Sequence, residues 1–316
     1  GRATWTQETA SDTTTNRVHR GLSRLSAFSR FPSSLATTDI GWRPCLELIQ
    51  PGSEPYNTID DGPGPGVESL QYDAATDTGY YGEVAYTDLI QGSSLASSVG
   101  LSAGTAQHDT EGYLKFYWHG KVLFIAKKPF RHTTSWDDIY TAGVVHGFGS
   151  QPGGGTGTSL NGPYATGSTA PGNVAQTKNV TVGSYNFRVR LLRGAKELFV
   201  DTTGYNLNTS CSLNLGGGSE WNELIYRIHQ DVPECPNSLT YDGGPQVGSN
   251  WANLTDTDIV VGSGDGRATW TQETASDITT NRVHRGNLSL SGFSRITSST
   301  AAAAARGWRP CLELVL

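Results

Sequence analysis

The blocks GRATWTQETASDITTNRVHRG at Gly266–Gly286 and GWRPCLEL at Gly307–Leu314 lie near the end of this 316-residue chain, and both also occur at its beginning. The first block recurs at Gly1–Gly21 with one difference, and the second recurs unchanged at Gly41–Leu48. Repeats of stacked units usually have periods of about 20 to 50 residues, whereas these copies lie a whole domain apart. The duplicated blocks therefore indicate a domain-sized internal repeat.

The copies differ mainly in the stretch between the two blocks, which is Leu22–Ile40 in the first copy and Asn287–Arg306, one residue longer, in the second. Within the blocks the one difference is Thr13 in place of Ile278. A variable stretch on a constant framework is typical of a binding loop, because a scaffold positions loops for recognition. The alternative is a loop that drifts because nothing depends on it, and the sequence leaves both interpretations open.

The stretch between the copies, residues 51–265, occurs once. We therefore expect one complete unit over 51–316, preceded by residues 1–50 as a partial copy of the C-terminal part of such a unit. This organisation predicts either a domain array or an assembly in which one copy completes the fold of another. The expected partners are other copies of the same protein.

Composition indicates the remaining boundaries. Gln50–Gly66 (QPGSEPYNTIDDGPGPG) is rich in Pro, Gly and Asp, which predicts a linker over 51–78. A small module containing a β-hairpin is predicted over 79–132, and a larger domain over 133–316. The chain as a whole is expected to be β-rich and of the α+β class.

Two β-hairpins are predicted from local patterns. Tyr113–Trp118 (YLKFYW) and Lys121–Lys128 (KVLFIAKK) alternate apolar and polar residues around a His119-Gly120 turn. Val180–Val182 and Phe187–Leu192 indicate a second pair of strands.

Helices are predicted at three places. Ser135 precedes Trp136-Asp137-Asp138, so it is placed as the N-cap of a short helix whose acids suit the positive end of the helix dipole. Ser219 is placed to cap a helix that continues through His229, with its apolar residues on one face. Short helical turns are expected over 80–101.

Composition also argues against several classes of protein. The chain has Gly 39 and charged residues at 16%, a balance typical of loop-rich extracellular proteins. The net charge of −6 argues against a nucleic-acid partner. No stretch approaches the roughly 18 apolar residues of a membrane helix, so membrane insertion is not expected. Met 0 indicates a processed chain or a window from a longer polypeptide.

From Ser219 onward the order of motifs resembles a known family. SEWNELIYRIH is followed by a loop-rich stretch with Trp251, and then by ATWTQET, RVHRG, a Ser-rich loop and GWRPCLEL. This order is similar to that of the C-type-lectin-like fold as used by the formylglycine-generating-enzyme superfamily and by phage receptor-binding proteins. GYYGEV at Gly79–Val84 and SWDDIYTAGVV look like modules of phage tail and virion proteins. The resemblance covers most of residues 79–316.

The resemblance implies a C-type-lectin-like domain over 133–316, with the terminal strand beside the RVHRG strand. Trp308 would then fill the core, and Arg282, Arg285 and Arg309 would tie loops through hydrogen bonds. The family's oxidase activity needs a cysteine pair in the terminal region, where this chain has Cys311 alone. No enzymatic activity is therefore expected.

Cysteines and acids leave two questions of chemistry open. One unit holds Cys211, Cys235 and Cys311, so a buried free thiol and a Cys211–Cys235 disulfide are both possible. Asp60-Asp61-Gly62 and Asp256-Thr257-Asp258 offer oxygen ligands to calcium, although neither continues into an EF-hand. No cofactor other than calcium is considered.

Aromatic and arginine side chains of the framework and its loop are the candidate binding or assembly residues: Trp5, Arg17, Trp42, Trp270, Arg282, Trp308, Phe293 and Arg295. The leading hypothesis is a non-enzymatic structural and recognition protein of a phage virion, such as a tail or fibre component, located on the virion or another extracellular surface. Its receptor would be a glycan or protein of the host or cell surface. The alternative is a repeat subunit of a bacterial or archaeal extracellular filament or adhesin.

Overall fold

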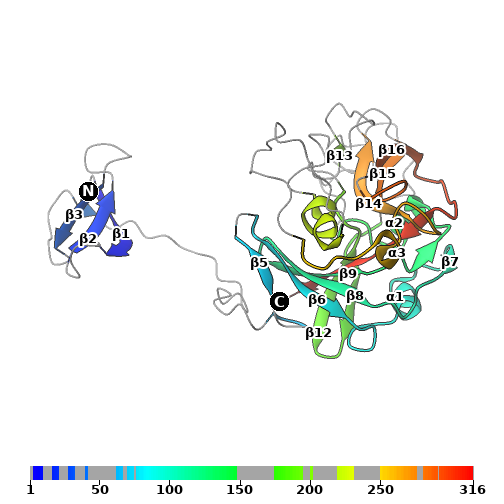
Figure 1. Ribbon diagram of the computed structural model, residues 1–316, viewed down its shortest axis with the longest axis horizontal. Coiled ribbons are helices and arrows are strands. Elements are labelled where there is room, and N and C mark those ends of the chain that lie inside the picture. Colours follow the sequence, from blue (N-terminus) through cyan, green and yellow to red (C-terminus); the bar gives the residue numbers. More distant parts are fainter. Residues whose placement is uncertain are drawn as a thin grey trace. The chain divides into compact units, whose positions relative to one another are not determined.

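The computed structural model describes the chain in part. Backbone and side chains are described for 62–66, 70–74, 76–147, 174–194, 219–230, 250–273, 280–290, 292–294 and 297–315, and the backbone alone for 3–9, 16–20, 28–32, 40–41, 200–201, 274–275 and 295–296. The chain divides into two compact units, Gly1–Pro55 and Tyr56–Leu316 (Figure 1).

Seven antiparallel strands form the first sheet of the larger unit, in the order β11-β12-β18-β9-β8-β6-β5. Their bounds are β5 Gln71–Asp73, β6 Thr78–Val84, β8 Tyr113–Trp118, β9 Lys121–Ala126, β11 Asn179–Val182, β12 Tyr185–Arg190 and β18 Cys311–Val315. β18 lies between β9 and β12, so this sheet is continuous only with residues 311–315 in place.

Both predicted hairpins are confirmed. β8 and β9 pair from Tyr113 with Ala126 to Trp118 with Lys121. The φ angles of His119 and Gly120 are 47° and 80°, which are typical of a type I′ turn between two strands. β11 and β12 form the second pair.

The expectation of helical turns over 80–101 is wrong for 80–84 and right further along the chain, where the Asp88 and Leu89 N–H groups donate to the Ala85 and Tyr86 carbonyls in a turn. Helix α1 spans Gly92–Val99. Tyr80 instead lies in β6, where it pairs with Phe116 of β8. Tertiary pairing with the neighbouring hairpin thus determines the structure of β6.

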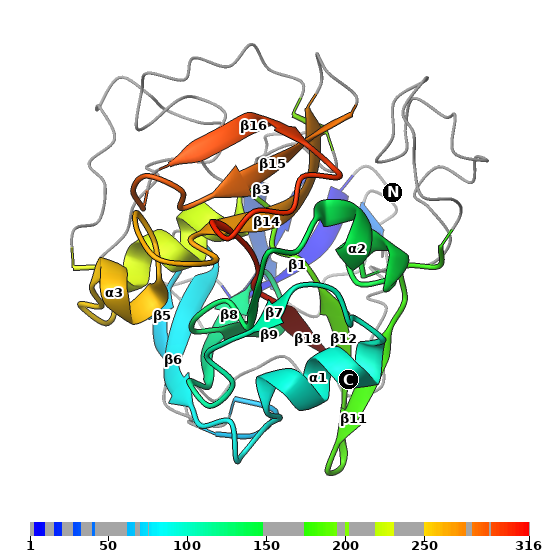
Figure 2. The same ribbon diagram turned by 90° about the vertical axis from the view of Figure 1, so that its right-hand side faces the viewer.

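Both faces of the first sheet are buried in apolar clusters. Tyr113 of β8 and Leu312 of β18 belong to one cluster, whereas Leu114 and Cys311, their neighbours in sequence, belong to the other. This alternation follows from the opposite directions of successive side chains in a strand. Helices α1 and α2 (Trp136–Thr141) contribute to the first cluster and η2 (Trp221–Ile225) to the second. Figure 2 shows α1 and α2 on its near side.

The second sheet of the larger unit has the order β16-β15-β14-β17-β10-β7, and β13 also pairs with β14. The bounds are β7 Thr105–Ala106, β10 Arg131–His132, β13 Val200–Asp201, β14 Ala268–Ala275, β15 Asn281–Arg285, β16 Phe293–Ser298 and β17 Arg306–Trp308. β10 pairs with β17, and β9 pairs with β18 in the first sheet. The ranges 79–132 and 133–316, expected as separate domains, therefore share both sheets.

The predicted cap of α2 is confirmed. The Ser135 hydroxyl accepts a hydrogen bond from the Asp138 N–H, and the Asp138 carboxylate accepts one from the Ser135 N–H. This reciprocal capping box satisfies two backbone donors at the start of the helix. A second capping box, of Thr255 and Asp258, starts the short helix α3 (Asp256–Ile259).

The longer predicted helix is present with two corrections. It is a π-helix over η2 and a 3₁₀-helix over η3 (Tyr226–Ile228), and it ends at Ile228, one residue before His229. Trp221, Leu224, Ile225 and Ile228, which the sequence places on one face, are buried, and Asn222, Glu223 and Arg227 are buried as well. Polar side chains are buried here because residues of both sheets offer them partners.

At the level of class, the fold is β-rich with few helices and α+β, as expected from the sequence. Of the helices in the described ranges, none combines the length and apolar character needed to cross a bilayer.

Candidate assembly site

The smaller unit contains a four-stranded sheet of order β3-β2-β1-β4. Its strands are β1 Ala3–Thr9, β2 Asn16–Arg20, β3 Phe28–Pro32 and β4 Ile40–Gly41. They correspond in sequence to β14, β15, β16 and β17, which have the same order in the larger unit. We call residues 1–50 the leading segment, residues 266–316 the closing segment, and residues 51–265 the body.

The two sheets share the same register as well as the same order. In the leading segment Thr4 pairs with Arg20, Trp5 with His19, and Thr9 with Arg17, with an irregularity between Trp5 and Thr9. In the closing segment the equivalent pairs are Thr269 with Arg285, Trp270 with His284, and Thr274 with Arg282, with the irregularity at the same place. Each copy also joins its first and fourth strands in parallel. The duplicated sequence therefore forms the same sheet twice.

The extra residue of the closing segment lies in a β-bulge. Phe28 pairs with Arg20 as Phe293 pairs with Arg285, at an offset of 265 residues. Further along, Arg17 pairs with Phe31, and its equivalent Arg282 pairs with Thr297. Phe31 and Thr297 are 266 residues apart, one more than Phe28 and Phe293. The register of β15 and β16 shifts between these pairs. One extra residue in one strand is the definition of a bulge, so the insertion leaves the rest of the sheet unchanged.

Tryptophans join the closing segment to the body. The Trp270 Nε1 donates to the Thr134 carbonyl at 2.7 Å, and the Trp136 Nε1 donates to the Thr271 carbonyl at 2.8 Å. Trp270, Trp136 and Trp308 are each 0% exposed. A buried indole N–H needs an acceptor, and for Trp270 and Trp136 the body and the segment supply it to each other. Within the described residues the Trp308 Nε1 has no such partner.

Arg285 is a second connection between segment and body. Its guanidinium donates to the Gly194 carbonyl at 2.7 Å, the Asn222 Oδ1 at 2.8 Å and the Tyr226 hydroxyl at 2.7 Å, all in the body. A longer bond of 3.3 Å reaches the Gly292 carbonyl within the segment. The side chain is fully buried, so its hydrogen bonds offset the desolvation of a charge.

Arg282 and Arg309 complete this set of buried arginines. The Arg282 guanidinium carbon lies 4.4 Å from the ring centroid of Trp136. Arg309 donates to the carbonyls of Lys127 at 2.6 Å and of Ile259 in the body. Burial lowers the pKa of Arg309 to about 9. Arg285 and Arg309 thus bind carbonyls of distant loops, as the resemblance implies, whereas Arg282 contacts the Trp136 ring and donates to the carbonyl of its neighbour Asn281.

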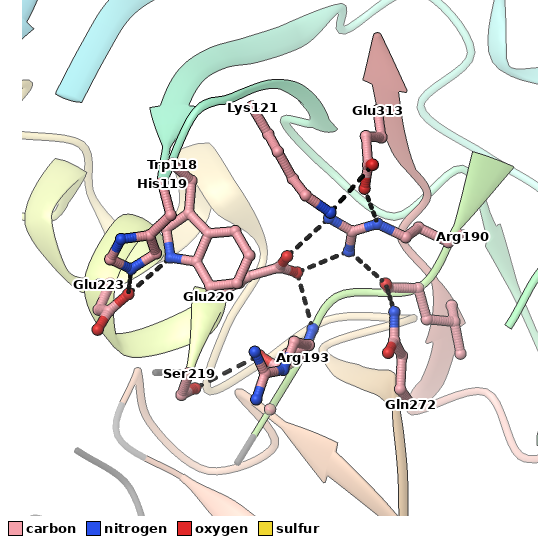
Figure 3. A network of polar contacts seen from close by, with 12 residues as sticks. Trp118, His119, Lys121, Arg190, Arg193, Ser219, Glu220, Glu223, Gln272 and Glu313 are labelled. Atoms are coloured by element: carbon pink, nitrogen blue, oxygen red, sulfur yellow. Dashed lines mark hydrogen bonds and ion pairs between the residues drawn. The ribbon is translucent and has the colours of Figure 1, made fainter. Parts of the chain in front are cut away.

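A polar network holds β18 in the first sheet (Figure 3). The Glu313 carboxylate accepts from the Arg190 Nε at 2.9 Å and from the Lys121 Nζ at 3.0 Å. Arg190 also binds Glu220 of the body through two hydrogen bonds of 2.8 and 2.7 Å. Burial alone would raise the pKa of Glu313, but the charges of Arg190 and Lys121 outweigh it and lower that pKa.

The same view shows a group at the edge of the network that belongs to the body alone. The Glu223 carboxylate of η2 accepts a hydrogen bond from the Trp118 Nε1 at 2.6 Å and lies 3.2 Å from the His119 Nε2. Glu223 therefore connects η2 to the turn between β8 and β9. The hydrogen bond to Glu223 raises the pKa of His119, although partial burial opposes this shift. Nothing in this group comes from the duplicated sequence.

The predicted site residues fall into two sets. Trp270, Arg282 and Trp308 are buried where the closing segment meets the body, and Phe293 is 8% exposed beside Arg285. Trp5 and Arg17 lie in β1 and β2, and Arg295 in β16, as backbone positions. Trp42 lies outside the described residues. The sequence analysis missed Trp136, Arg190, Glu220 and Glu313, of which Glu313 alone could have been noticed, because it lies in a duplicated block.

Two open questions of chemistry are partly answered. Asp258 accepts hydrogen bonds from the N–H and hydroxyl of Thr255, and Asp256 lies 3.2 Å from the His229 Nε2. In the described ranges no cluster of His, Cys, Asp or Glu has the arrangement of a metal site. Cys311 is a buried free thiol whose pKa burial raises, which makes a reactive thiolate unfavourable. Cys211 and Cys235 lie outside the described residues.

Comparison with known proteins gives no assignment: no family model, no curated protein and no solved structure matches this chain. The chemistry of the site therefore has to be interpreted from its own contacts. These contacts join the closing segment to the body: the body offers buried acceptors, cations and three strand edges, and a segment of defined sequence satisfies them. We call these body groups, with the β9, β10 and β12 edges, the closing site.

Proposed function

We propose that this protein is a non-enzymatic structural and recognition protein of a phage virion, a tail or fibre component that functions as a multi-copy assembly. The observation that supports it is the duplicated sheet. One chain carries two segments with the sequence and register needed to fill a closing site, and residues 51–265 provide one such site. A second segment of this kind is useful where copies of the protein lie side by side.

The C-type-lectin-like scaffold belongs to this proposal. The order of motifs from Ser219 supports it. The expected position of the terminal strand beside the RVHRG strand is wrong, because β18 pairs with β9 and β12 of the first sheet, whereas β15 lies in the second sheet. Recognition would fall to the stretch that differs between the copies. Leu288 in that stretch is 80% exposed, so its side chain is accessible to a partner.

A bacterial or archaeal extracellular filament or adhesin is the second candidate. The same duplicated sheet supports it, because filaments also form from repeated units that contact one another head to tail. The two candidates differ in the receptor and in the shape of the particle rather than in the closing site.

The solution mass and electron microscopy images of the purified full chain test the assembly role. We expect particles of several copies with a regular symmetry, in a tail-like or fibre-like form. A protein that stays monomeric up to high concentration would contradict this function. Leu288→Ser should leave the particles intact and weaken attachment to host cells, which separates recognition from assembly.

A further inference from the structure

We propose, as a step that rests on the proposed function, that the closing site of one copy accepts the leading segment of a second copy in place of its own closing segment. The exchange would link neighbouring molecules in the assembly. Its basis is the correspondence between the two segments, residue by residue, at the contacts with the body.

Every closing-segment side chain described above as touching the body has an identical counterpart in the leading segment. The leading segment has the same residue at each of these positions. Its Trp5, Arg17, Arg20, Trp42, Arg43 and Glu47 correspond, in this order, to Trp270, Arg282, Arg285, Trp308, Arg309 and Glu313 of the closing segment. The backbone that presents the first three has the same register in β1 and β2 as in β14 and β15. The leading segment thus offers the closing site the same donors and acceptors in the same order.

The differences between the segments lie mainly away from these contacts. The bulge insertion is in β16, the strand at the edge of its sheet. The differences in or next to the sheet include three positions. Thr297, which is 8% exposed and 3.1 Å from the His284 Nε2, corresponds to Phe31, and Gly292 corresponds to Ala27. Arg306, whose guanidinium carbon lies 6.0 Å from the Trp270 ring centroid, corresponds to Ile40. They make the two segments unequal competitors without changing a contact to the body.

Exchange keeps the number of filled closing sites constant. Each hydrogen bond between the body and the closing segment is replaced by the same bond to a leading segment, so the main cost is that of bringing two molecules together. An assembly that holds copies side by side removes most of this cost, because it raises the effective concentration of the neighbouring segment. We therefore expect exchange in the assembled protein and little exchange in dilute solution.

An empty closing site would not persist. Trp270, Trp308, Leu312 and Leu314 are part of the first apolar cluster, so removal of the closing segment exposes the core of the first sheet. Exchange must therefore proceed by partial opening followed by rapid replacement, and it should be slow compared with assembly.

The test uses the pair Lys121 and Glu313, which lie 3.0 Å apart and can be joined by a carbodiimide. The reagent condenses the carboxylate with the amine to an amide and takes up the water released. Equal amounts of unlabelled and ¹⁵N-labelled full chain are assembled together, treated and digested, and the cross-linked peptides are identified by mass. We expect Lys121–Glu313 peptides and, in addition, Lys121–Glu47 peptides that join a labelled to an unlabelled chain.

Two control variants make the result specific. Glu47→Gln should remove the mixed-label cross-link and retain Lys121–Glu313, whereas Lys121→Gln should remove both. Assembled particles that yield Lys121–Glu313 and no Lys121–Glu47 would overturn the exchange and leave the proposed function standing. Lys121–Glu47 peptides confined to single molecules would overturn the role of a second copy. Absence of any assembly would instead count against the proposed function.

Discussion

The sheet β1–β4 and the sheet β14–β17 have the same framework sequence, order and register, yet they belong to different surroundings. β17 pairs with β10, which pairs with β7, and Trp270, Trp308, Arg282 and Arg285 of this sheet are buried. β1–β4 is a sheet of four described strands in a separate compact unit. The comparison teaches that this sequence forms the same strand pairing in both units, and that in the closing segment the body adds partners to it.

Matched substitutions at the equivalent tryptophan of each copy should give the largest difference in stability between the two variants. Trp270→Ala removes a fully buried indole and its bond to Thr134, so it should cost the larger unit about 3–5 kcal/mol in dilute protein. Trp5→Ala should leave the unfolding of that unit unchanged, because the closing segment already fills the site. Urea unfolding followed by the fluorescence of the remaining tryptophans measures both. Equal losses from the two substitutions would show that the copies are not distinct in their role.

Matched substitutions at the arginine of each copy should give a smaller difference. Arg285→Ala leaves the Asn222 and Tyr226 side chains without this donor in the interior, at a cost of about 2–3 kcal/mol. Arg20→Ala is its counterpart in the leading segment and should be silent in dilute solution. Thermal unfolding of the two variants beside the unaltered chain provides the measurement. An Arg285→Ala protein as stable as the original would mean that these hydrogen bonds make no net contribution to the free energy of unfolding.

The pH dependence of stability sharpens the comparison further. Burial raises the pKa of Glu273 to about 7 from 4.5, although the N–H of Gly194 and the hydroxyl of Thr271 oppose the shift. Because the folded pKa is the higher one, this contribution to stability is full below about pH 4.5 and is lost as the pH rises through 7. The Glu273 carboxyl by itself should therefore lower the stability of the larger unit by on the order of 2 kcal/mol between pH 5 and pH 8. Burial lowers the pKa of His146 and of His284 to about 3, and these two side chains act in the opposite direction over the same range.

Glu273→Gln should remove the contribution of Glu273 alone, because the amide does not titrate, so the variant should gain stability relative to the original chain as the pH rises from 5 to 8. The equivalent change Glu8→Gln should leave the slope as it is. The free energy of unfolding, measured by urea titration at several pH values, distinguishes the two. A slope that is the same with and without Glu273→Gln would show that Glu273 contributes nothing to the pH dependence.

Deletion of Ile296 should have the smallest effect. It restores the shorter spacing of the leading segment, whose β2 and β3 pair without a register shift. The bulge is in the edge strand of its sheet, so we expect a change below about 1 kcal/mol. The melting temperature of the deletion variant is the measurement. Loss of the folded unit would show that the bulge is required rather than tolerated.

Elements that depend on local sequence were predictable in this chain. The β8–β9 hairpin and the cap of α2 follow from a Gly-containing turn and from a serine three residues before an acid, and both are confirmed. Elements that depend on distant partners were not. β6 became a strand through β8, and the polar side of η2 became buried through residues of both sheets.

The candidate site divides in the same way. Trp270, Arg282 and Trp308 could be selected from the sequence because they lie in duplicated blocks. Arg190 and Glu220 could not, since nothing local distinguishes a buried ion pair from two solvated charges. The two residues are 30 positions apart in sequence, and Glu313, the second partner of Arg190, is 123 positions from it. Sequence repetition identified the segment, and the structure identified the body groups that hold it.

Amide hydrogen exchange in the two copies of the duplicated block, measured at increasing protein concentration, tests the central claim most directly. Peptides that include Thr13 or Ile278 differ in mass, so the two copies can be followed separately. We expect the leading copy to exchange much faster than the closing copy in dilute protein and to gain protection as assembly proceeds. A leading copy whose protection is independent of concentration would contradict the claim that its missing partner is the body of another molecule.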